Sequence, residues 1–378
     1  MNFYSVQAYS YFCGQSVDKF NIDGHKMQYH LERTAQWLRA KTINEKLNVF
    51  PIYLEISPVG HCNHRCTFCA VDYIGYKPRS LQTELLKERI SEMASAGVRS
   101  IMFAGEGEPL LHNQLPELIN HTKQQGIDVA VTTNGTQLSQ AFIEKCMHSI
   151  TWLKISVNGG TMETYAKIHQ TKEADFDKVW NNLATACLYR ELNGIKCTIG
   201  IQSVLLPDNI NTVEDLVVDA KHCGLDYVVI KPYSQHHKSI TTLYKDIKYG
   251  NALNMAAELA KHNTESFEVV TRYISMQNHD SDERGYSKCY STPFLWAYIM
   301  ATGDVYGCSA YLLDKRFCYG NINEKSFVDI WTGEQRKTAI DFVENSLDIT
   351  ECRKNCRMDK VNRYLWDIKN PQPHENFI

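Results

Sequence analysis

The chain has 378 residues, of which 43% are hydrophobic and 22% charged, and its formal net charge is −3. This composition is typical of a folded globular protein, and the length allows two domains. The small net charge gives no electrostatic reason to expect nucleic acid as a partner. The N-terminus lacks the pattern of a signal peptide, and the longest apolar run, 293–301, is too short to cross a membrane. We therefore expect a cytoplasmic protein with no membrane partner.

The first two thirds of the chain predict an α/β fold. Residues 1–50 are expected to form an N-terminal extension, with a helix over 30–41, that packs on a core domain over 51–235. Within that core, apolar β-branched runs alternate with amphipathic patterns, which indicates parallel strands covered by helices. The predicted strands cover 52–57, 100–105, 128–133, 152–157, 198–204 and 227–232. In an open sheet or a barrel alike, the active site is expected beyond the C-terminal ends of these strands.

Two of the predicted helices have defined ends. One covers 85–97 and stops at Gly97, a residue type that favours the conformation found just after helices. The other covers 211–224, where Asn211 stands three positions before Glu214 in a capping arrangement and Gly224 closes the helix.

The pattern changes after residue 235. Residues 236–285 are expected to form a linking helical segment, and 286–378 a cysteine-bearing domain with a C-terminal tail. Within this domain, "ATGDVYGC" (301–308) predicts a hairpin and "RFCYGNI" (316–322) a further strand.

Most of the 13 cysteines are expected to be reduced thiols or metal ligands in a cytoplasmic protein. Three of them, Cys62, Cys66 and Cys69, fall within eight positions. A zinc site would take its fourth ligand from His61 or His64. An iron–sulfur cubane held by three thiolates would instead keep one iron open. The scattered cysteines are expected to be small buried hydrophobic residues, namely Cys13, Cys146, Cys187, Cys197, Cys223 and Cys318.

The C-x3-C-x2-C spacing, with Phe68 before the last cysteine and a predicted strand before the loop, resembles the radical S-adenosylmethionine (radical SAM) superfamily. The resemblance implies a partial (β/α)6 TIM-like barrel. It also implies a 4Fe–4S cluster on Cys62, Cys66 and Cys69 whose open iron binds SAM. In that family, an electron from the cluster cleaves the sulfonium and gives a 5′-deoxyadenosyl radical.

Four further segments resemble the SAM-binding pattern of the family at successive strand ends. "FAGEGEPLLH" (103–112) resembles the Gly-Gly-Glu segment that binds the SAM ammonium, with Glu106 in place of the first glycine. "TTNGT" (132–136) and "KISVNGG" (154–160) resemble SAM-contacting strand ends, and "GIQSVLLPDN" (200–209) resembles the segment that flanks adenine. The residues that the resemblance assigns to SAM are Phe68, Gly107, Glu108, Thr133, Asn134, Ser156, Asn158 and Gln202.

The C-terminal cysteines form a second group, consisting of Cys289, Cys308, Cys352 and Cys356. Their spacing resembles the SPASM and twitch domains of radical SAM enzymes, and the order of a hairpin pair, a long gap and a close pair is similar to that of the dehydrogenase of butirosin biosynthesis. The resemblance implies one auxiliary 4Fe–4S cluster with four cysteine ligands, and Cys318 is a lesser candidate ligand. A structural zinc site with four thiolates is the alternative.

A fully ligated second cluster favours electron transfer, and so a net two-electron oxidation of a small polar substrate such as a sugar or nucleotide sugar. Lys231, Tyr233 and His236, at the end of the last predicted strand, are candidate substrate-binding or base residues, or else plain loop residues. An electron donor such as flavodoxin or ferredoxin is the implied partner.

Three alternatives stay open. Radical epimerisation would need a thiol hydrogen donor, for which Cys197 and Cys318 are candidates. A peptide-modifying SPASM enzyme is disfavoured because only 50 residues precede the first predicted strand. A zinc-stabilised binding module on an α/β scaffold is the non-enzymatic alternative.

Overall fold

The computed structural model describes residues 19–281 and 284–377, so Cys13 and the start of the expected N-terminal extension lie outside the described residues. The strands are β1 (Tyr53–Ile56), β2 (Ser100–Phe103), β3 (Asp128–Thr133), β4 (Trp152–Ser156), β5 (Thr198–Leu205), β6 (Tyr227–Pro232), β7 (Glu268–Thr271), β8 (Trp296–Ile299), β9 (Asp304–Tyr306) and β10 (Cys318–Asn321). The helices are α2 (Leu31–Arg39), α3 (Ile43–Leu47), α4 (Thr83–Ser95), α5 (Leu115–Gln124), α6 (Gln140–Cys146), α7 (Met162–His169), α8 (Ala174–Leu192), α9 (Val213–His222), α10 (Ala252–Ala260), α11 (Tyr273–Asp280), α12 (Phe327–Trp331), α13 (Glu334–Asn345) and α14 (Asp359–Lys369).

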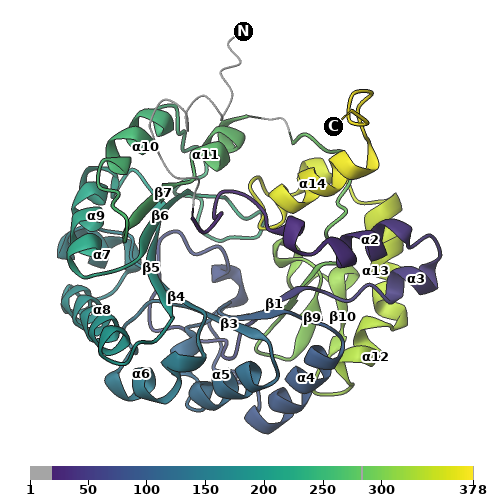
Figure 1. The fold of residues 1–378 in the computed structure, drawn as a ribbon, viewed down its shortest axis with the longest axis horizontal. Coiled ribbons are helices and arrows are strands. Elements are labelled where there is room, and N and C mark those ends of the chain that lie inside the picture. The colour runs from purple at the N-terminus through teal and green to yellow at the C-terminus, as the bar shows by residue number, and fades with distance from the viewer. Residues whose placement is uncertain (1–18, 282–283, 378) are drawn as a thin grey trace.

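The strands form one curved sheet in the order β10-β9-β8-β1-β2-β3-β4-β5-β6-β7. Strands β1 to β7 are parallel to their neighbours, and β8 joins β1 in parallel on the other side. Helices surround this sheet on its outer side, and the sheet curves without closing (Figure 1). The predicted α/β architecture with a partial barrel is confirmed, and all six predicted strands are present.

Side chains on the two faces of the sheet have different surroundings. Because successive residues of a strand point to opposite faces, Leu153 and Ile155 of β4 pack in the buried core beneath the outer helices. Their neighbours on the same strand, Trp152, Lys154 and Ser156, point to the inner face. We call the space enclosed by this inner face the lumen.

Of the predicted helix ends, the C-terminal one at Gly97 is confirmed and the N-terminal one at Asn211 is not. Helix α4 ends as expected, because Gly97 follows it with a φ of 86°. The capping arrangement predicted at Asn211 is wrong. That residue lies in a 3-10 turn, and α9 begins at Val213 after Thr212, without a side-chain cap. Asn209 instead holds the chain just before this turn, since its side chain accepts from the Leu206 amide and donates to the Val204 carbonyl.

The segment 236–285 is not only helical. It contains α10, β7 and α11, and β7 pairs with β6 in parallel, so the β/α order continues for one more strand. The sequence prediction missed β7 because this edge strand has only four residues, of which Val269 and Val270 are buried. The expected boundaries of the core and linking segments stay predictions.

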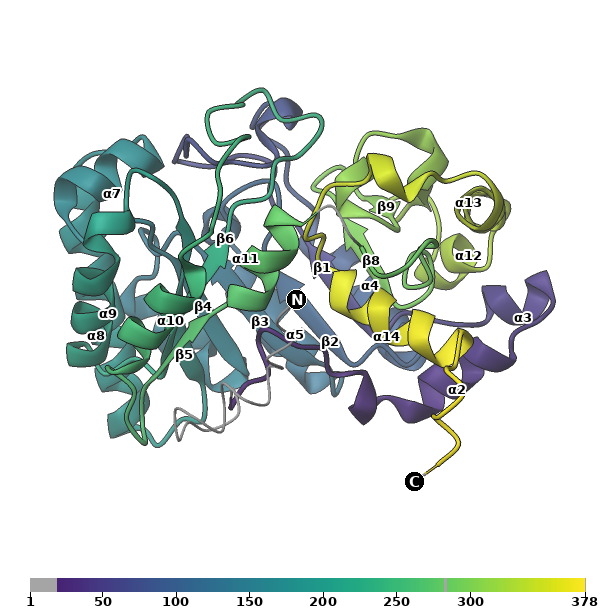
Figure 2. The ribbon, with the colours of Figure 1, turned by 90° about the horizontal axis from the view of Figure 1, so that it is seen from above.

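The C-terminal cysteine-bearing region extends the same sheet. The predicted hairpin is β8–β9, and the strand predicted at 316–322 is β10, which pairs antiparallel with β9. These strands and α12, α13 and α14 lie beside the β/α core (Figure 2).

Helix α2 of the N-terminal extension packs mainly on the C-terminal region, where Trp37 contacts a cluster with Leu295, Ile340 and Leu365. Arg336 of α13 reinforces this contact, because its buried guanidinium donates to five backbone carbonyls, those of Lys46, Leu47, Val49, Pro293 and Trp331.

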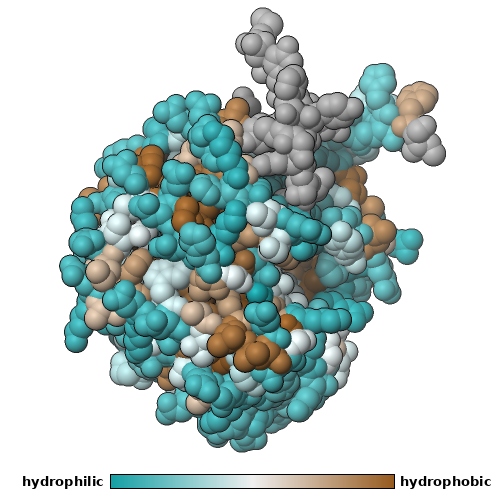
Figure 3. All heavy atoms as spheres, turned by 60° about the vertical axis from the view of Figure 1, so that its left-hand side comes forward, coloured by the Kyte–Doolittle hydropathy of each residue, from teal (hydrophilic) through white to brown (hydrophobic). Residues whose placement is uncertain are grey.

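The described part of the chain contains no helix that is long and apolar enough to span a bilayer. On the face that Figure 3 shows, hydrophilic side chains predominate and hydrophobic ones occur in small groups. Such scattered groups need no partner to explain them.

Candidate functional site

The loop that follows β1 carries Cys62, Cys66 and Cys69 at the C-terminal edge of the parallel strands. The three thiols are partly exposed and free of disulfides. Burial raises the pKa of Cys62 to about 11, and the neighbouring Cys69 adds to the effect. Three such thiols cannot ionise together without a cation, and metal binding reverses this by holding the thiolate form. The donor set therefore fits an iron–sulfur cluster.

Backbone contacts fix this loop on both sides. The Thr67 amide donates to the Ile168 carbonyl at 2.9 Å, and the Thr67 hydroxyl lies 3.0 Å from the Tyr244 hydroxyl. The Asp72 carboxylate accepts hydrogen bonds from the amides of Ile240 and Thr241, each at 2.9 Å. The cysteines are thus positioned by α7 and by the segment after β6 as well as by their own loop.

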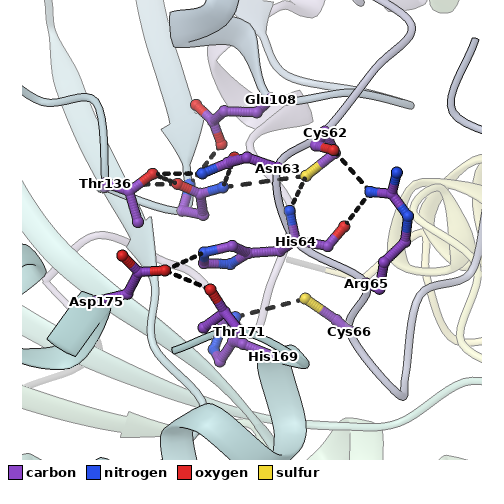
Figure 4. A network of polar contacts seen from close by, with 12 residues as sticks. Cys62, Asn63, His64, Arg65, Cys66, Glu108, Thr136, His169, Thr171 and Asp175 are labelled. Carbon is purple, nitrogen blue, oxygen red and sulfur yellow. Dashed lines mark hydrogen bonds and ion pairs between the residues drawn. The ribbon is translucent and has the colours of Figure 1, made fainter. Parts of the chain in front are cut away.

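Glu108 connects the loop after β2 to the end of β3 (Figure 4). Its carboxylate is buried and accepts from the Thr133 hydroxyl at 2.5 Å and from the Asn134 amide at 2.8 Å. The Asn134 side chain then donates to Asn63 in the cysteine loop at 2.7 Å. Burial raises the pKa of Glu108, and these donors oppose the shift. The expected SAM contacts Glu108, Thr133 and Asn134 are therefore brought together beside Cys62.

The two residues before Glu108 have distinct structural roles. A Cβ on Gly107 would lie 2.4 Å from the Val59 carbonyl and 2.5 Å from the His61 carbonyl, so only glycine fits there. Glu106 is buried and accepts from the Ala301 amide at 3.1 Å, which links this loop to the end of β8. Its other carboxylate oxygen has no partner among the described residues, and burial raises its pKa to about 7.

Ser156 is the last residue of β4, Asn158 follows that strand, and Gln202 lies within β5, where it is paired in register with Ser156. Asn158 is completely buried, and its side-chain oxygen Oδ1 accepts a hydrogen bond from the Val204 amide at 2.6 Å. Its amide group lies 3.2 Å from the Ser156 hydroxyl. Asn158 thus faces the protein interior, and its expected contact with SAM stays a prediction. Phe68 packs against the buried side chains of Val204 and Tyr233.

His169, at the end of α7, is held in one tautomer. The Asn158 backbone amide donates to His169 Nε2 at 3.1 Å, so that this nitrogen must be an acceptor. The proton is then on Nδ1, which lies 3.4 Å from the Cys66 sulfur and donates to it. Burial lowers the pKa of His169 far below its usual value, which keeps the ring neutral. A neutral N–H donor thus faces one of the expected cluster ligands.

His64 is the buried member of the cysteine loop. Its Nε2 lies 3.7 Å from the Asp175 carboxylate, while burial lowers its pKa more than Asp175 raises it. The ligand atoms of His64, Cys66 and His169 all lie within 4.8 Å of one another. This set includes only one of the three motif cysteines, so it differs from the zinc site considered above, which takes all three with His61 or His64.

The four C-terminal cysteines converge from distant parts of the chain. One cavity is lined by Cys289, Cys308, Cys352 and Cys356, with aromatic and apolar side chains around them. Burial, and then the neighbouring thiols, raise the pKa of Cys308 well above its usual value. Four half-buried thiols around one space fit a four-thiolate centre. Cys318 is not among the residues that line this cavity, and its sulfur contacts the Gly320 carbonyl.

A side-chain amide also contacts this second group of cysteines. The Asn362 carbonyl oxygen accepts from the backbone amides of Tyr290 and Ser291, which directs its amide nitrogen to the Cys289 sulfur at 3.5 Å. The Tyr311 hydroxyl lies 3.4 Å from the Cys352 sulfur.

The candidate catalytic residues at the end of β6 separate into two groups. Lys231 points to the lumen, as described below. Tyr233 is buried, and its hydroxyl donates to Gln235 at 2.9 Å. His236 is also buried and stacks on Tyr73, and burial lowers its pKa to about 4. Their catalytic roles stay predictions.

Comparison with known families agrees with this geometry. Residues 56–220 match the family model of the radical SAM superfamily. This part of the chain is a radical SAM domain. Residues 289–357 match the SPASM iron-sulfur cluster-binding domain. SAM and 4Fe–4S clusters therefore fit the chain as its cofactors.

Two curated relatives show how far the likeness extends. The chain is 35% identical over 112 residues to the S-adenosylmethionine-dependent nucleotide dehydratase of Lacinutrix mariniflava, which covers 28% of this chain and 23% of that protein. It is 22% identical over 307 residues to the tungsten-containing aldehyde ferredoxin oxidoreductase cofactor-modifying protein of Pyrococcus furiosus, with 75% and 81% covered. Since the chain spans less than a quarter of the dehydratase's length, the activity of that relative is not carried over.

A solved structure supports the fold. Streptococcus suis SuiB bound to the precursor peptide SuiA superposes with a TM-score of 0.63 at 17% identity, covering 83% of this chain and 71% of that chain. At this identity the likeness concerns the fold alone.

Sequence patterns missed three residues of the site, namely Glu106 as a buried carboxylate, His169 and Asp175. His169 is 103 residues from Cys66 in the chain, and no spacing rule connects them. The sequence shows that Glu106 of "GEGEP" departs from the glycine pattern of the family. It does not show that this carboxylate is buried.

Proposed function

We propose that this enzyme cleaves SAM reductively at the three-cysteine loop and oxidises a small polar substrate in the lumen by two electrons. The observation that carries the proposal is the pair of cysteine groups, three at the ends of the parallel strands and four in a separate cavity. Three thiolates would leave a coordination position for SAM, whereas four would leave none.

A cluster held by Cys62, Cys66 and Cys69 would supply the electron that converts SAM to methionine and a 5′-deoxyadenosyl radical. The chain's own residues bind and orient the reactants. Glu108 keeps the loop after β2 against β3, and Gly107 lets that loop approach the cysteine loop. Ser156 and Gln202 offer polar groups at the strand ends above the lumen.

The proposed oxidation removes one hydrogen atom from a substrate C–H, then one proton and one electron. The four-cysteine site is the proposed electron acceptor. Glu106 is the proton acceptor that we favour, because burial raises its pKa to about 7 and one of its oxygens has no partner among the described residues. His236, whose pKa is lowered to about 4, is a weaker base. Flavodoxin or ferredoxin is the proposed electron donor.

Epimerisation has less support, because both candidate thiols lie away from the lumen. Cys197 is buried in the core beneath the outer helices. Cys318 lies on β10 and pairs there with Tyr306. The names of the dehydratase and of the GTP 3′,8-cyclase of Rhizobium etli, which is 30% identical over 186 residues, indicate nucleotide substrates. They support a small polar substrate more than a peptide.

The test is anaerobic turnover with dithionite, in which release of 5′-deoxyadenosine is measured. We expect the triple variant Cys62→Ala, Cys66→Ala, Cys69→Ala to lose this release and to retain the second cluster. Cys223→Ala is the matched control, since this thiol lies just after α9. Release by the triple variant at the wild-type rate, or zinc in place of iron, would overturn the proposal.

A further inference from the structure

We propose that the lumen binds the substrate through an anionic group, a phosphate or diphosphate, held by Lys154 and Lys231 with help from Arg353 and Arg357. This inference rests on the proposed function and adds the chemical class of the substrate.

The two lysines face the lumen from β4 and β6, the strands on either side of β5. Lys154 of β4 lies between Leu153 and Ile155, which both pack in the outer core, so its own side chain points inward. Lys231 of β6 follows Ile230, which is likewise in the outer core, and is paired in register with Val204. The two ammonium groups are close enough for Lys154 to lower the pKa of Lys231.

The two arginines reach the lumen from the segment that carries the last two cluster cysteines. Arg357 donates to the Tyr53 hydroxyl at 3.1 Å and pairs with the Glu55 carboxylate at 2.6 Å, both on β1. Arg353 donates to the Ser234 hydroxyl at 3.1 Å, just beyond β6. The segment 352–357 therefore connects the two sides of the lumen at the ends of β1 and β6.

Positive charge in this region exceeds the negative charge that could balance it. Within residues 19–281 and 284–377, neither Lys154 nor Lys231 forms a hydrogen bond or an ion pair, and the Lys154 ammonium lies 4.9 Å from the centre of the Trp152 ring. Glu55, the carboxylate that acts on Lys154, is already paired with Arg357. The auxiliary thiolates offset part of the charge on Arg353, but the lysines have no such neighbour.

An uncompensated ammonium in a protein interior is costly, and its pKa responds accordingly. Burial, and then Arg357, lower the pKa of Lys154 to about 7. Burial, and then Lys154, lower the pKa of Lys231 well below its usual value. An anion bound between them would restore both charges. A cluster of cations that lacks its counter-charge thus has the properties of an anion site.

Solvent also reaches these side chains, although they lie deep in the fold. The Arg357 side chain is 40% exposed, while Glu55 beside it is only 6% exposed. Lys154 and Lys231 are half-buried. Lys154 is two residues before Ser156 on the same face of β4, whereas Lys231 is paired with Val204, two residues beyond Gln202, so the anion site lies beside the predicted SAM contacts. Two lysines and two arginines match the several acceptor oxygens of a phosphate or diphosphate better than one carboxylate.

The test uses the full-length protein with its clusters reconstituted anaerobically and SAM present. Isothermal titration with inorganic pyrophosphate is compared between the wild type, the double variant Lys154→Met/Lys231→Met, and Lys178→Met. Lys178 is an exposed lysine of α8 and serves as the control. We expect the double variant to bind pyrophosphate at least about tenfold more weakly, which is the loss of two charge-assisted contacts, and the control to bind normally.

Equal affinity of the double variant and the wild type would overturn the inference. Tighter binding of citrate than of pyrophosphate would also overturn it, in favour of a carboxylate substrate. Iron content and the circular dichroism spectrum show whether the double variant folds. If it does not fold, the single variants Lys154→Gln and Lys231→Gln decide in the same assay. Release of 5′-deoxyadenosine in the absence of substrate is measured in parallel. If the wild-type enzyme shows no such release, the proposed function is refuted and not the anion site.

Discussion

The two cysteine groups of this enzyme differ in what surrounds their sulfur atoms. Around Cys62, Cys66 and Cys69, the neighbours are polar and include Asn134 and His169. The cavity of the four C-terminal cysteines is lined largely by aromatic and apolar side chains, such as those of Trp296, Phe317 and Met358. A polar surrounding suits a site that must bind a charged cosubstrate, whereas an apolar one suits a centre that only passes electrons.

The largest expected effect comes from separating the two groups. In the variant Cys289→Ala/Cys352→Ala, we expect iron to fall by about four atoms per chain and substrate oxidation to be lost. Release of 5′-deoxyadenosine should persist, because the three-cysteine loop is intact. Iron analysis and product detection measure the two outcomes. Loss of SAM cleavage in this variant would show that the two groups are not independent.

Glu108→Ala should be the next most damaging change, because Glu108 accepts hydrogen bonds in the buried connection between the three-cysteine loop and β3. It leaves the buried donors of Thr133 and Asn134 without an acceptor. We expect a loss of about 2–4 kcal/mol in the free energy of unfolding, from two such groups. Urea denaturation of the apoprotein measures it. Glu163→Ala, on the exposed surface of α7, is the control and should change stability little.

His169 tests whether the polar surrounding tunes the first cluster. His169→Phe removes the N–H donor to Cys66. A hydrogen bond stabilises the reduced, more negative cluster more than the oxidised one, so the reduction potential of this cluster should fall in the variant. A hydrogen bond to a charged acceptor contributes about 1.5–3 kcal/mol, which limits the shift to about 65–130 mV for one electron.

Redox titration followed by electron paramagnetic resonance measures the effect of the His169 variants. His169→Asn places an amide N–H near the position of Nδ1 and should restore most of the wild-type potential. Identical potentials in wild type and His169→Phe would show that the hydrogen bond has no effect on the cluster.

The smallest effect concerns the lumen between the two groups and its dependence on pH. Lys154 has a pKa lowered to about 7 by burial and by Arg357 and Arg272, with Glu55 acting in the opposite direction. Below that pH the ammonium is charged and above it is neutral. Pyrophosphate affinity should therefore fall severalfold between pH 6 and pH 8.5, after correction for the protonation of pyrophosphate itself. In Lys154→Arg, whose charge does not titrate in this range, this part of the decrease should disappear.

The sequence predicted the strands of the sheet better than their surroundings. Strands β1 to β6 have nearly continuous apolar runs, because both faces of each strand are covered, and such runs are visible without a structure. Strand β7 has four residues at an edge, and β8 lies in "PFLWAYIMA" (293–301), which was noted only as apolar. Its parallel pairing with β1 is a contact over more than 200 residues that no local pattern encodes.

In the site, too, the residues of local motifs were predicted and those brought together only by folding were not. The cysteines and the Glu108 segment were recognisable because the family pattern is local in sequence. His169, Asp175 and the charges of the lumen were not, since they come together only when α7, α8 and the C-terminal segment pack on the sheet. The capping error at Asn211 has a similar cause, because Asn209 holds the chain before that turn and donates to the carbonyl of Asn158, a residue 51 positions away.

The segment 352–357 contains two of the auxiliary cysteines and both lumen arginines. Each of these arginines directly follows a cysteine, so the binding of iron to Cys352 and Cys356 would also fix the position of the two guanidinium groups. A freshly made polypeptide without its second cofactor would therefore keep the two strand lysines in place but would lack the metal-bound segment that fixes the arginines beside them.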